Sequence, residues 1–265
     1  MVLFISFAGW LAYKMLGVKK VKSLPASFEG SYRGILSGKV NFYKQLTIAE
    51  QAIFEKRMLY FLSQVTITGI NTTVEDDDRV FVGASAIIPI FGFPDWEYNN
   101  LNEVLLYPDS FNKDFLKAAG EEKTILGMVG EGAMQHVMVL SQPSLRQGFT
   151  NQTDKANTGI HEFVHLVDKT DGAIDGIPEN LANKQHLLPW IKRMHENIRE
   201  IVANRSDINP YGATNEAEFF AVVSEYFFEQ PQLLQSKHPE LYDLLQTIFR
   251  QHPAGKKIIP LMEEH

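Results

Sequence analysis

The pattern of apolar and polar positions predicts a chain of mixed helices and strands. A capping-box sequence from Thr47 to Glu50 begins a segment whose large apolar residues recur at helical spacing as far as Val65. Shorter apolar runs bounded by turn residues are typical of strands. The predicted elements are helices at 47–65, 80–90, 189–204 and 215–230, and strands at 65–70, 103–107 and 135–141. We therefore expect an α+β fold with a small mixed sheet.

Polar stretches separate these elements. Residues 71–78 end in an acidic run from Glu75 to Asp78, which we interpret as a polar turn and a solvated helix start. Residues 109–132 contain four glycines and are predicted to be rich in loops. The strand at 135–141 would suit the addition of an extended peptide if it lies at an edge of the sheet.

The stretch from Gly159 to Asp168 contains His-Glu-x-x-His within an apolar helical pattern. His161 and His165 are four residues apart, so both imidazoles leave the same face of a helix, one turn apart. This spacing lets both rings bind one zinc ion, and Glu162 then has the position of a general base beside a zinc-activated water. The alternative is that ordinary hydrogen bonds satisfy both histidines in a core helix.

Both ends of this helix carry candidate caps. The candidates are Asp154, Asn157 or Thr158 at the start and Gly172 at the end. Asp168 lies on the face of the histidines, where it could orient a histidine ring or face solvent. The loop at 168–176 does not match a calcium-binding loop, because a threonine occupies a ligand position and no glutamate completes it. We interpret this loop as the C-terminal turn of the helix.

A carboxylate on a later helix can complete the zinc site. Glu218 lies at the rim of the apolar face of the helix at 215–230, where an unpaired charge is costly unless it binds a metal or a partner. Two histidines and such a glutamate form the His₂Glu arrangement of catalytic zinc sites, with water in the fourth position. The competing carboxylates are Glu216, expected to be exposed, Glu225, expected to contact a ligand or form a salt bridge, and Glu229, expected to be solvated in the last turn.

Composition narrows the classes of function. Of the 265 residues, 45% are hydrophobic and 11% aromatic, which suffices for a sizeable core. The net charge of −7 provides no basic surface for nucleic acid, so we expect no nucleic-acid partner. The chain has no cysteine, so a zinc site here must use His, Asp, Glu and water.

The N-terminal residues 2–18 form an apolar run followed directly by three lysines at 19, 20 and 22. The run is short for a full membrane span, and the basic flank would keep the rest of the chain cytoplasmic. The alternative is an amphipathic or buried helix. The predicted organisation is an apolar helix and candidate membrane anchor at 1–22, a glycine-containing linker at 23–41 and a zinc metallopeptidase domain at 42–265.

Taken together, these motifs resemble the Mlc titration factor A family of gluzincin-type, zinc-dependent peptidases. Their site region also resembles the catalytic domain of anthrax lethal factor. The sequences that carry the resemblance are HEFVHLVD at 161–168, Asp-Gly-Ile-Pro at 175–178, Tyr211 followed at position 218 by Glu, AEFFAVVSEYFFEQP at 217–231 and, more weakly, NEVLLYPDSF at 102–111 and the helix at 47–65. The resemblance covers roughly residues 42–252.

The resemblance implies roles for five residues. In the family the zinc ligands match His161, His165 and Glu218, the catalytic glutamate matches Glu162, and the catalytic tyrosine matches Tyr211. As a neutral phenol, Tyr211 would donate a hydrogen bond to the oxyanion. Without the resemblance, Tyr211 would be interpreted as a loop tyrosine packed against the helix.

The resemblance also implies aminopeptidase-type activity on short peptides in some members and a regulatory link to the repressor Mlc in others. The apolar N-terminus departs from the soluble members, so the link to Mlc is not carried over. We expect a cytoplasmic zinc metallopeptidase acting on peptides or proteins, with membrane contact through residues 2–18. The alternatives are a membrane-tethered regulatory binding protein of the Mlc titration factor type and a metal-dependent hydrolase of non-peptide amides or esters.

Overall fold

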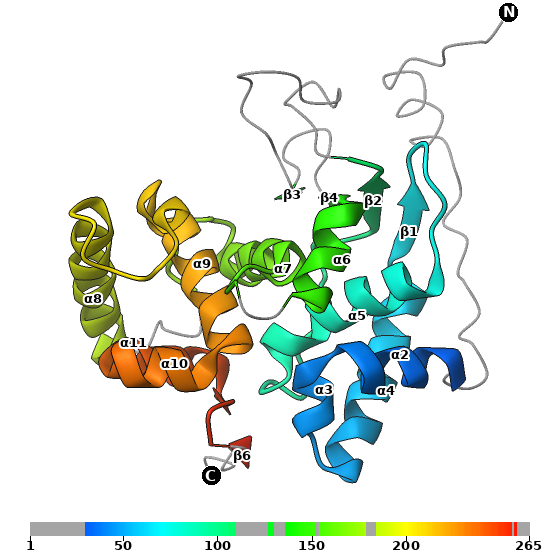
Figure 1. The fold of residues 1–265 in the computed structure, drawn as a ribbon, viewed down its shortest axis with the longest axis horizontal. Helices are drawn as coiled ribbons and strands as arrows, with labels where there is room; N and C mark the ends of the chain where they lie inside the picture. Colours follow the sequence, from blue (N-terminus) through cyan, green and yellow to red (C-terminus); the bar gives the residue numbers. More distant parts are fainter. Residues whose placement is uncertain are drawn as a thin grey trace, which may run out of the picture.

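A small mixed sheet forms one side of the molecule (Figure 1). The computed structural model describes residues 30–109, 127–129, 136–151, 154–178, 184–255 and 257–258. The main sheet has the order β1-β2-β4-β3, with β1 at Thr66–Gly69, β2 at Glu103–Tyr107, β3 at Gly127–Val129 and β4 at Val137–Ser141. β1, β2 and β4 are parallel, and β3 is antiparallel to β4. The predicted class, mixed α and β with a small mixed sheet, is confirmed.

Helices make up most of the described residues. They are α2 (Gly30–Lys39), α3 (Asn41–Gln45), α4 (Ile48–Gln64), α5 (Asp76–Ile90), α6 (Gln142–Thr150), α7 (Thr158–Asp168), α8 (Lys184–Val202), α9 (Glu216–Glu229), α10 (Pro231–Lys237) and α11 (Pro239–Phe249). Two 3₁₀ turns, η2 (Lys169–Asp171) and η4 (Pro210–Ala213), precede α8 and α9. A short antiparallel pair, β5 (Gln251–His252) and β6 (Lys257–Ile258), follows α11.

Helix α7 lies between α5 and α9 (Figure 1). Every residue from Gly159 to Asp168 is buried. The run of α5 from Val80 to Ile90 is buried throughout, and so is the run of α9 from Phe219 to Phe228. The ring of Phe163 packs edge-on against that of Tyr98, with ring centres 5.2 Å apart. Because α7 is enclosed on several sides, its polar side chains are held in defined positions.

Capping residues and short apolar patterns in the sequence predicted several elements correctly. Thr47 caps α4, and its backbone N–H donates to Oε2 of Glu50 at 2.7 Å, which completes the predicted capping box. Asn215 caps α9 by accepting the N–H of Glu218 at 2.8 Å. The strand predicted at 103–107 has the bounds of β2, and α8 begins five residues before the predicted start at Pro189. Helices α6, α10 and α11 were not predicted.

Part of the predicted linker at 23–41 is helical. From Gly30 onward these residues form α2 and the start of α3, and Leu36 and Val40 are 0% and 1% exposed. The glycines that suggested a linker lie on the exposed side of α2. An exposed glycine costs a helix about 1 kcal/mol relative to alanine, which is less than the burial of a large apolar side chain provides. Tertiary packing therefore overrides the local glycine signal.

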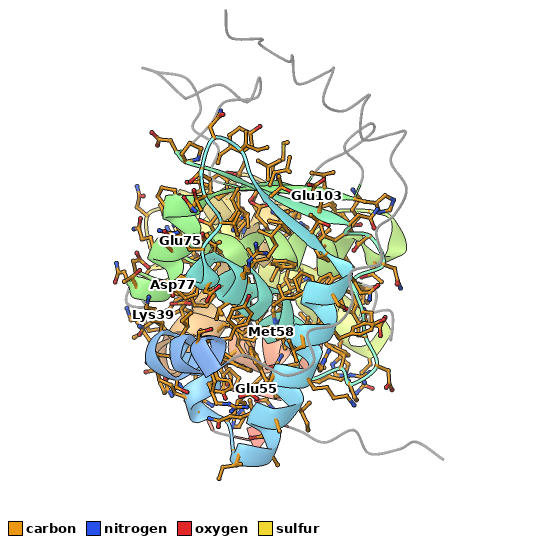
Figure 2. All side chains as sticks on the ribbon, turned by 90° about the vertical axis from the view of Figure 1, so that its right-hand side faces the viewer. Lys39, Glu55, Met58, Glu75, Asp77 and Glu103 are labelled. Carbon is orange, nitrogen blue, oxygen red and sulfur yellow. The ribbon has the colours of Figure 1, made fainter. Side chains whose placement is uncertain are left out.

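Charged contacts attach α2 to two later helices. Nζ of Lys39 lies 2.6 Å from Oδ2 of Asp77 at the start of α5 (Figure 2). Arg33 donates two hydrogen bonds to Glu55 of α4, at 2.7 and 2.6 Å, and the Tyr43 hydroxyl donates a third at 2.6 Å. The bonds from Arg33 hold the pKa of Glu55 below its ordinary value. Residues 30–45 are thus part of the folded domain.

The strand at 135–141 forms β4, which is not an edge strand. It lies between β2 and β3, so its backbone groups are paired on both sides. The edge is occupied by β3, which falls in the stretch 109–132 that was predicted to be rich in loops. Three residues that begin with a glycine are too short to show the alternation by which a strand is found in a sequence.

The acidic run begins α5, as predicted, but not all of it is solvated. Glu75 and Asp76 are exposed. Asp78 is 0% exposed and accepts hydrogen bonds from Nε of Arg146 at 2.7 Å and from Nε2 of Gln142 at 2.8 Å. Asp78 therefore joins α5 to α6, because its charge needs these donors when it is removed from water.

The predicted apolar helix at 1–22 lies outside the described residues. Within the described part of the chain, no helix has the length and apolar character needed to cross a membrane. The prediction for residues 2–18 stays a prediction.

Replacing Leu36 by alanine tests whether α2 belongs to the core. Leu36→Ala should lower the free energy of unfolding by about 2–5 kcal/mol, because it removes a fully buried side chain and leaves a cavity in the core. Ser37→Ala, at an exposed neighbouring position, should change it by less than about 0.5 kcal/mol. Urea unfolding followed by circular dichroism measures both. Equal midpoints for the two variants would show that α2 contributes nothing to the core.

Candidate metal centre

Asn157 fixes the start of α7. Its Oδ1 accepts the N–H of Ile160 at 3.0 Å, so among the three candidate caps Asn157 is the one used. Asn157 is 0% exposed, its backbone N–H donates to Oε2 of Glu225, and its Nδ2 donates to Oε1 of Glu229 at 3.1 Å. These contacts tie the first turn of α7 to α9, so the two helices keep one relative position.

The other end of α7 continues into η2 and stops at Gly172. Gly172 has φ +98°, the left-handed conformation in which a helix commonly ends. Asp168 is 0% exposed, so it does not face solvent. Its Oδ2 accepts the N–H of Gly176 at 2.8 Å. This bond holds the following loop against the helix, so the loop at 168–176 is the C-terminal turn that was predicted.

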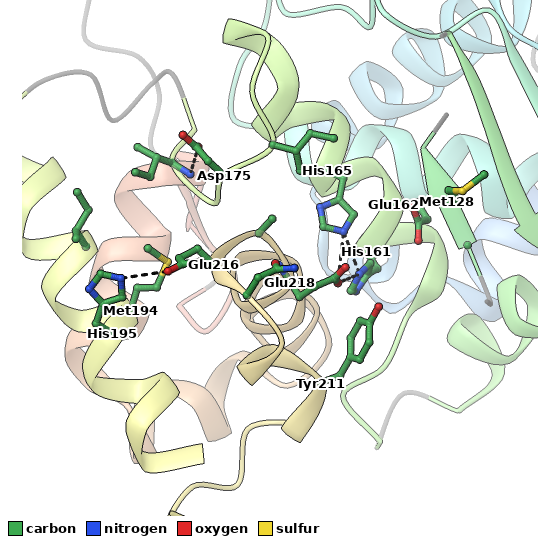
Figure 3. A pocket seen from close by; sticks show the side chains of 16 residues that line it. Met128, His161, Glu162, His165, Asp175, Met194, His195, Tyr211, Glu216 and Glu218 are labelled. Atoms are coloured by element: carbon green, nitrogen blue, oxygen red, sulfur yellow. Dashed lines mark hydrogen bonds and ion pairs between the residues drawn. The ribbon is translucent and has the colours of Figure 1, made fainter. Parts of the chain in front are cut away.

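Three of the predicted site residues converge (Figure 3). Nε2 of His161 lies 2.9 Å from Oε2 of Glu218 and 3.2 Å from Nε2 of His165. Nε2 of His165 lies 3.6 Å from the same oxygen of Glu218. Among the residues that the structure describes, these three form the one group of metal-ligating side chains whose ligand atoms all lie within 4.8 Å of one another.

The protonation of His161 indicates what this cluster can hold. Oε1 of Glu225 lies 2.7 Å from Nδ1 of His161, and an ionised carboxylate only accepts, so Nδ1 carries the proton and donates. When the ring is neutral, its Nε2 directs a lone pair at the carboxylate of Glu218 and at Nε2 of His165. Electron-pair donors that face one another in this way need a cation between them, which is either a proton or a metal ion. A metal ion fits this donor set.

The pKa values agree with a site that attracts positive charge. Burial alone would lower the pKa of His161, but the carboxylates of Glu225 and Glu218 raise it well above its usual value. Burial would raise the pKa of Glu218, but hydrogen bonds from His161 and His165 hold it well below its usual value. Protons and a metal ion therefore compete for the same atoms, so metal binding weakens as the pH falls.

The other three glutamates of α9 have distinct positions. Glu216 is exposed in the first turn, as predicted, and its Oε1 lies 3.4 Å from Nε2 of His195. Glu225 contacts the ligand His161, which was one of its two predicted positions. Glu229 is partly buried and not fully solvated as predicted, because the last turn of α9 packs against Asn157, and burial raises the pKa of Glu229 to about 8.

Glu162 lies beside the ligand cluster and is 5% exposed. Burial raises its pKa, and the two neighbouring histidines oppose this rise in part. Strand β3 approaches so closely that a Cβ atom at Gly127 would lie 2.5 Å from Oε1 of Glu162. A side chain at position 127 would therefore displace the Glu162 carboxylate. A carboxylate with a raised pKa accepts a proton more readily, as a general base must.

Tyr211 lies on η4, directly before α9. The centre of its ring is 5.9 Å from that of His161, and Figure 3 shows its hydroxyl directed toward the ligand cluster. Burial and the carboxylate of Glu218 raise the pKa of Tyr211 to about 12. The phenol therefore stays neutral at physiological pH and keeps a hydrogen that it can donate.

A cavity of about 680 Å³ opens over these groups. Its volume lies within the range typical of ligand sites. The described residues that line it come from β3, α7, the loop after η2, α8, η4 and the start of α9. His161, Glu162, His165, Tyr211 and Glu218 all line it, so the cavity brings together the five residues singled out in the sequence.

Glu225→Gln tests the carboxylate behind His161. The variant should bind its metal about 10–100-fold more weakly, because the neutral amide no longer holds Nδ1–H as strongly. Competition with a chromophoric chelator measures the affinity. The control Glu240→Gln makes the same change on α11, outside the cavity, and should bind as the unmodified protein does. Identical affinities for both variants would show that Glu225 does not support the metal ligand.

The sequence of the chain is similar to those of known proteins. The glucose-regulated metallo-peptidase M90 family matches residues 17–250. An uncharacterized protein of Synechocystis sp. is 30% identical over 234 residues, which cover 84% of each chain. Proteins named Mlc titration factor A from Pectobacterium atrosepticum and from Escherichia coli O1:K1 are each 27% identical over 227 residues, which cover 80% of each chain. The resemblance inferred from the motifs is thus confirmed, and the chain belongs to the glucose-regulated metallo-peptidase M90 family.

Proposed function

We propose that the protein is a gluzincin-type, zinc-dependent peptidase whose zinc ion is held by His161, His165 and Glu218. The observation that carries the proposal is the convergence of these three ligand atoms beside buried Glu162 in one cavity. Ligand atoms placed tetrahedrally about 2.0–2.1 Å from zinc are roughly 3.3–3.4 Å apart. The separations here are 2.9, 3.2 and 3.6 Å, and two imidazoles with one carboxylate suit zinc.

The residues of the cavity have separate roles in the proposed hydrolysis of a peptide bond. Zinc, when bound, lowers the pKa of a water ligand to about 7 and polarises a carbonyl group. Glu162 accepts the proton of the attacking water and transfers it to the nitrogen of the leaving amine. The neutral hydroxyl of Tyr211 donates a hydrogen bond to the oxyanion that forms from the scissile carbonyl. Glu225 keeps the proton of His161 on Nδ1 and so leaves Nε2 free to bind.

Strand β3 supports a peptide as the substrate. Among the described strands, β3 pairs only with β4, and its Gly127 and Met128 line the cavity. An extended peptide that adds to the other edge of β3 would form backbone hydrogen bonds and would pass Glu162, which Gly127 contacts closely. Non-peptide amides and esters lack a strand-like backbone and would gain nothing from this edge.

A regulatory binding protein is the second candidate. Relatives named Mlc titration factor A match 80% of the chain, and this name is compatible with a protein whose peptidase activity is secondary to binding a partner. Aminopeptidase-type activity on short peptides belongs to the first candidate, and assays with free and acetylated N-termini distinguish it from cleavage inside a chain.

Glu162→Gln tests hydrolysis separately from metal binding. The variant should keep about one zinc per chain but lose peptide hydrolysis by about 10²–10⁴-fold or more, because an amide cannot accept the proton. Asp95→Asn, a matched loss of one carboxylate outside the cavity, is the control. The readouts are elemental analysis and the rate of cleavage of a fluorogenic peptide. A Glu162→Gln rate close to that of the control would contradict the mechanism, and an unmodified zinc-loaded protein that cleaves no peptide would favour the binding protein.

A membrane anchor at residues 2–18 is a separate proposal, supported by the apolar run and the lysines that follow it. The full chain should sediment with membranes and resist high-salt extraction, because apolar insertion is not weakened by salt. A chain that starts at Ser23 should stay in the soluble fraction and keep its activity. Full-length protein found wholly in the soluble fraction would remove the anchor and leave the peptidase proposal unchanged.

A further inference from the structure

The cavity extends past the metal cluster toward α8. Figure 3 shows Met194 and His195 on α8, and Glu216 facing them on the side of Glu218 away from the two histidines. Met194 is 1% exposed and Ala217 is 9% exposed, so this end has a well-packed floor. The described apolar residues that line this end are Ile174, Ile177, Ile191, Met194 and Ala217.

Two carboxylates lie at the rim of this apolar floor. Gly176 has φ +75°, and a Cβ atom there would lie 2.4 Å from the backbone oxygen of Glu216, so the loop packs directly on the start of α9. Asp175, which precedes Gly176 in this loop, and Glu216 both line the cavity, and both side chains are exposed. Oδ1 of Asp175 accepts the N–H of Ile177 at 3.0 Å, which holds the carboxylate at the rim.

At this end of the cavity, the described residues that line it carry more negative than positive charge. Among the described residues that line the cavity there is no lysine and no arginine. Glu218 is engaged by the histidines, and Glu162 lies beside them, so neither carboxylate belongs to this end. Asp175 and Glu216 remain, with His195 as the only nitrogen base near them. An apolar floor with two carboxylates at its rim is complementary to a long side chain that ends in a cation.

We propose that this end of the cavity is a subsite for a lysine or arginine side chain of the peptide substrate. The methylene groups lie on the floor formed by Met194 and Ala217, and the cationic head lies at the rim, where the carboxylates of Asp175 and Glu216 attract it. This inference rests on the proposed peptidase function and adds to it the class of substrate.

Peptides that differ in one side chain test the subsite. A set of fluorogenic peptides carries lysine, arginine, norleucine or glutamate at one position at a time on either side of the scissile bond. Norleucine has the apolar stem of lysine without the charge. At one position, kcat/KM should be about fivefold or more higher for lysine than for norleucine, and lowest for glutamate. The ratio should fall as the salt concentration rises, because salt screens a partly exposed pair.

Binding to an inactive protein provides an independent readout. In the zinc-loaded Glu162→Gln protein, fluorescence anisotropy should give a Kd for the lysine peptide about fivefold lower than for the norleucine peptide. Adding Asp175→Asn and Glu216→Gln should bring this ratio close to one, and adding Glu216→Lys should invert it. Adding Asp95→Asn, outside the cavity, should leave the ratio as it was.

Two results would overturn the inference. Equal Kd values for the lysine and norleucine peptides at every position would show that no basic side chain is recognised. Loss of binding on acetylation of the N-terminus, without a preference for lysine, would assign the two carboxylates to the terminal amine of the substrate instead. Failure of the peptidase proposal is distinguishable from either result, because unmodified zinc-loaded protein would then cleave none of the peptides.

Discussion

Negative charge buried around two histidines is the constraint on which the rest of the site depends. Glu162 lies on α7, and Glu218, Glu225 and Glu229 reach α7 from α9. The described hydrogen bonds of these three α9 carboxylates include donors from histidine and asparagine, and no ion pair with lysine or arginine is found for them among the described residues. Buried carboxylates without a compensating cation are costly. With a pKa of about 8, Glu229 avoids its charge by staying protonated at neutral pH. The other charges are compensated when a metal ion binds the histidines, so the metal also stabilises the folded site.

One face of α9 supplies most of these groups. Glu225 and Glu229 follow Glu218 by seven and eleven residues, which are close to two and three helical turns, so the three side chains lie along one stripe. Glu218 contacts both histidines, Glu225 contacts Nδ1 of His161, and Glu229 contacts the cap Asn157. A displacement of α9 along its axis would move all three together. The packing of α9 on α7 therefore determines both the ligand geometry and the start of the helix that carries the histidines.

Features fixed by local spacing could be predicted from the sequence, and features fixed by tertiary packing could not. The histidines of α7 share a face because a helix has a fixed period, and Glu218 could be identified because a carboxylate at the edge of an apolar face needs a partner. The burial of Leu36 could not be predicted, because the glycines around it indicate a linker when their neighbours are unknown. Glu229 has the local sequence of a solvated last turn, and only its contact with another helix removes it from water. Strand β3 is too short to show a pattern.

The most direct test of the account is a crystal structure of the zinc-loaded protein with anomalous data collected on both sides of the zinc absorption edge. The account predicts one strong anomalous peak, about 2.0–2.2 Å from Nε2 of His161, Nε2 of His165 and a carboxylate oxygen of Glu218. The Glu225 carboxylate should still accept the proton on Nδ1 of His161. A structure in which zinc binds other residues, or in which Glu218 turns away from the two histidines, would contradict the account.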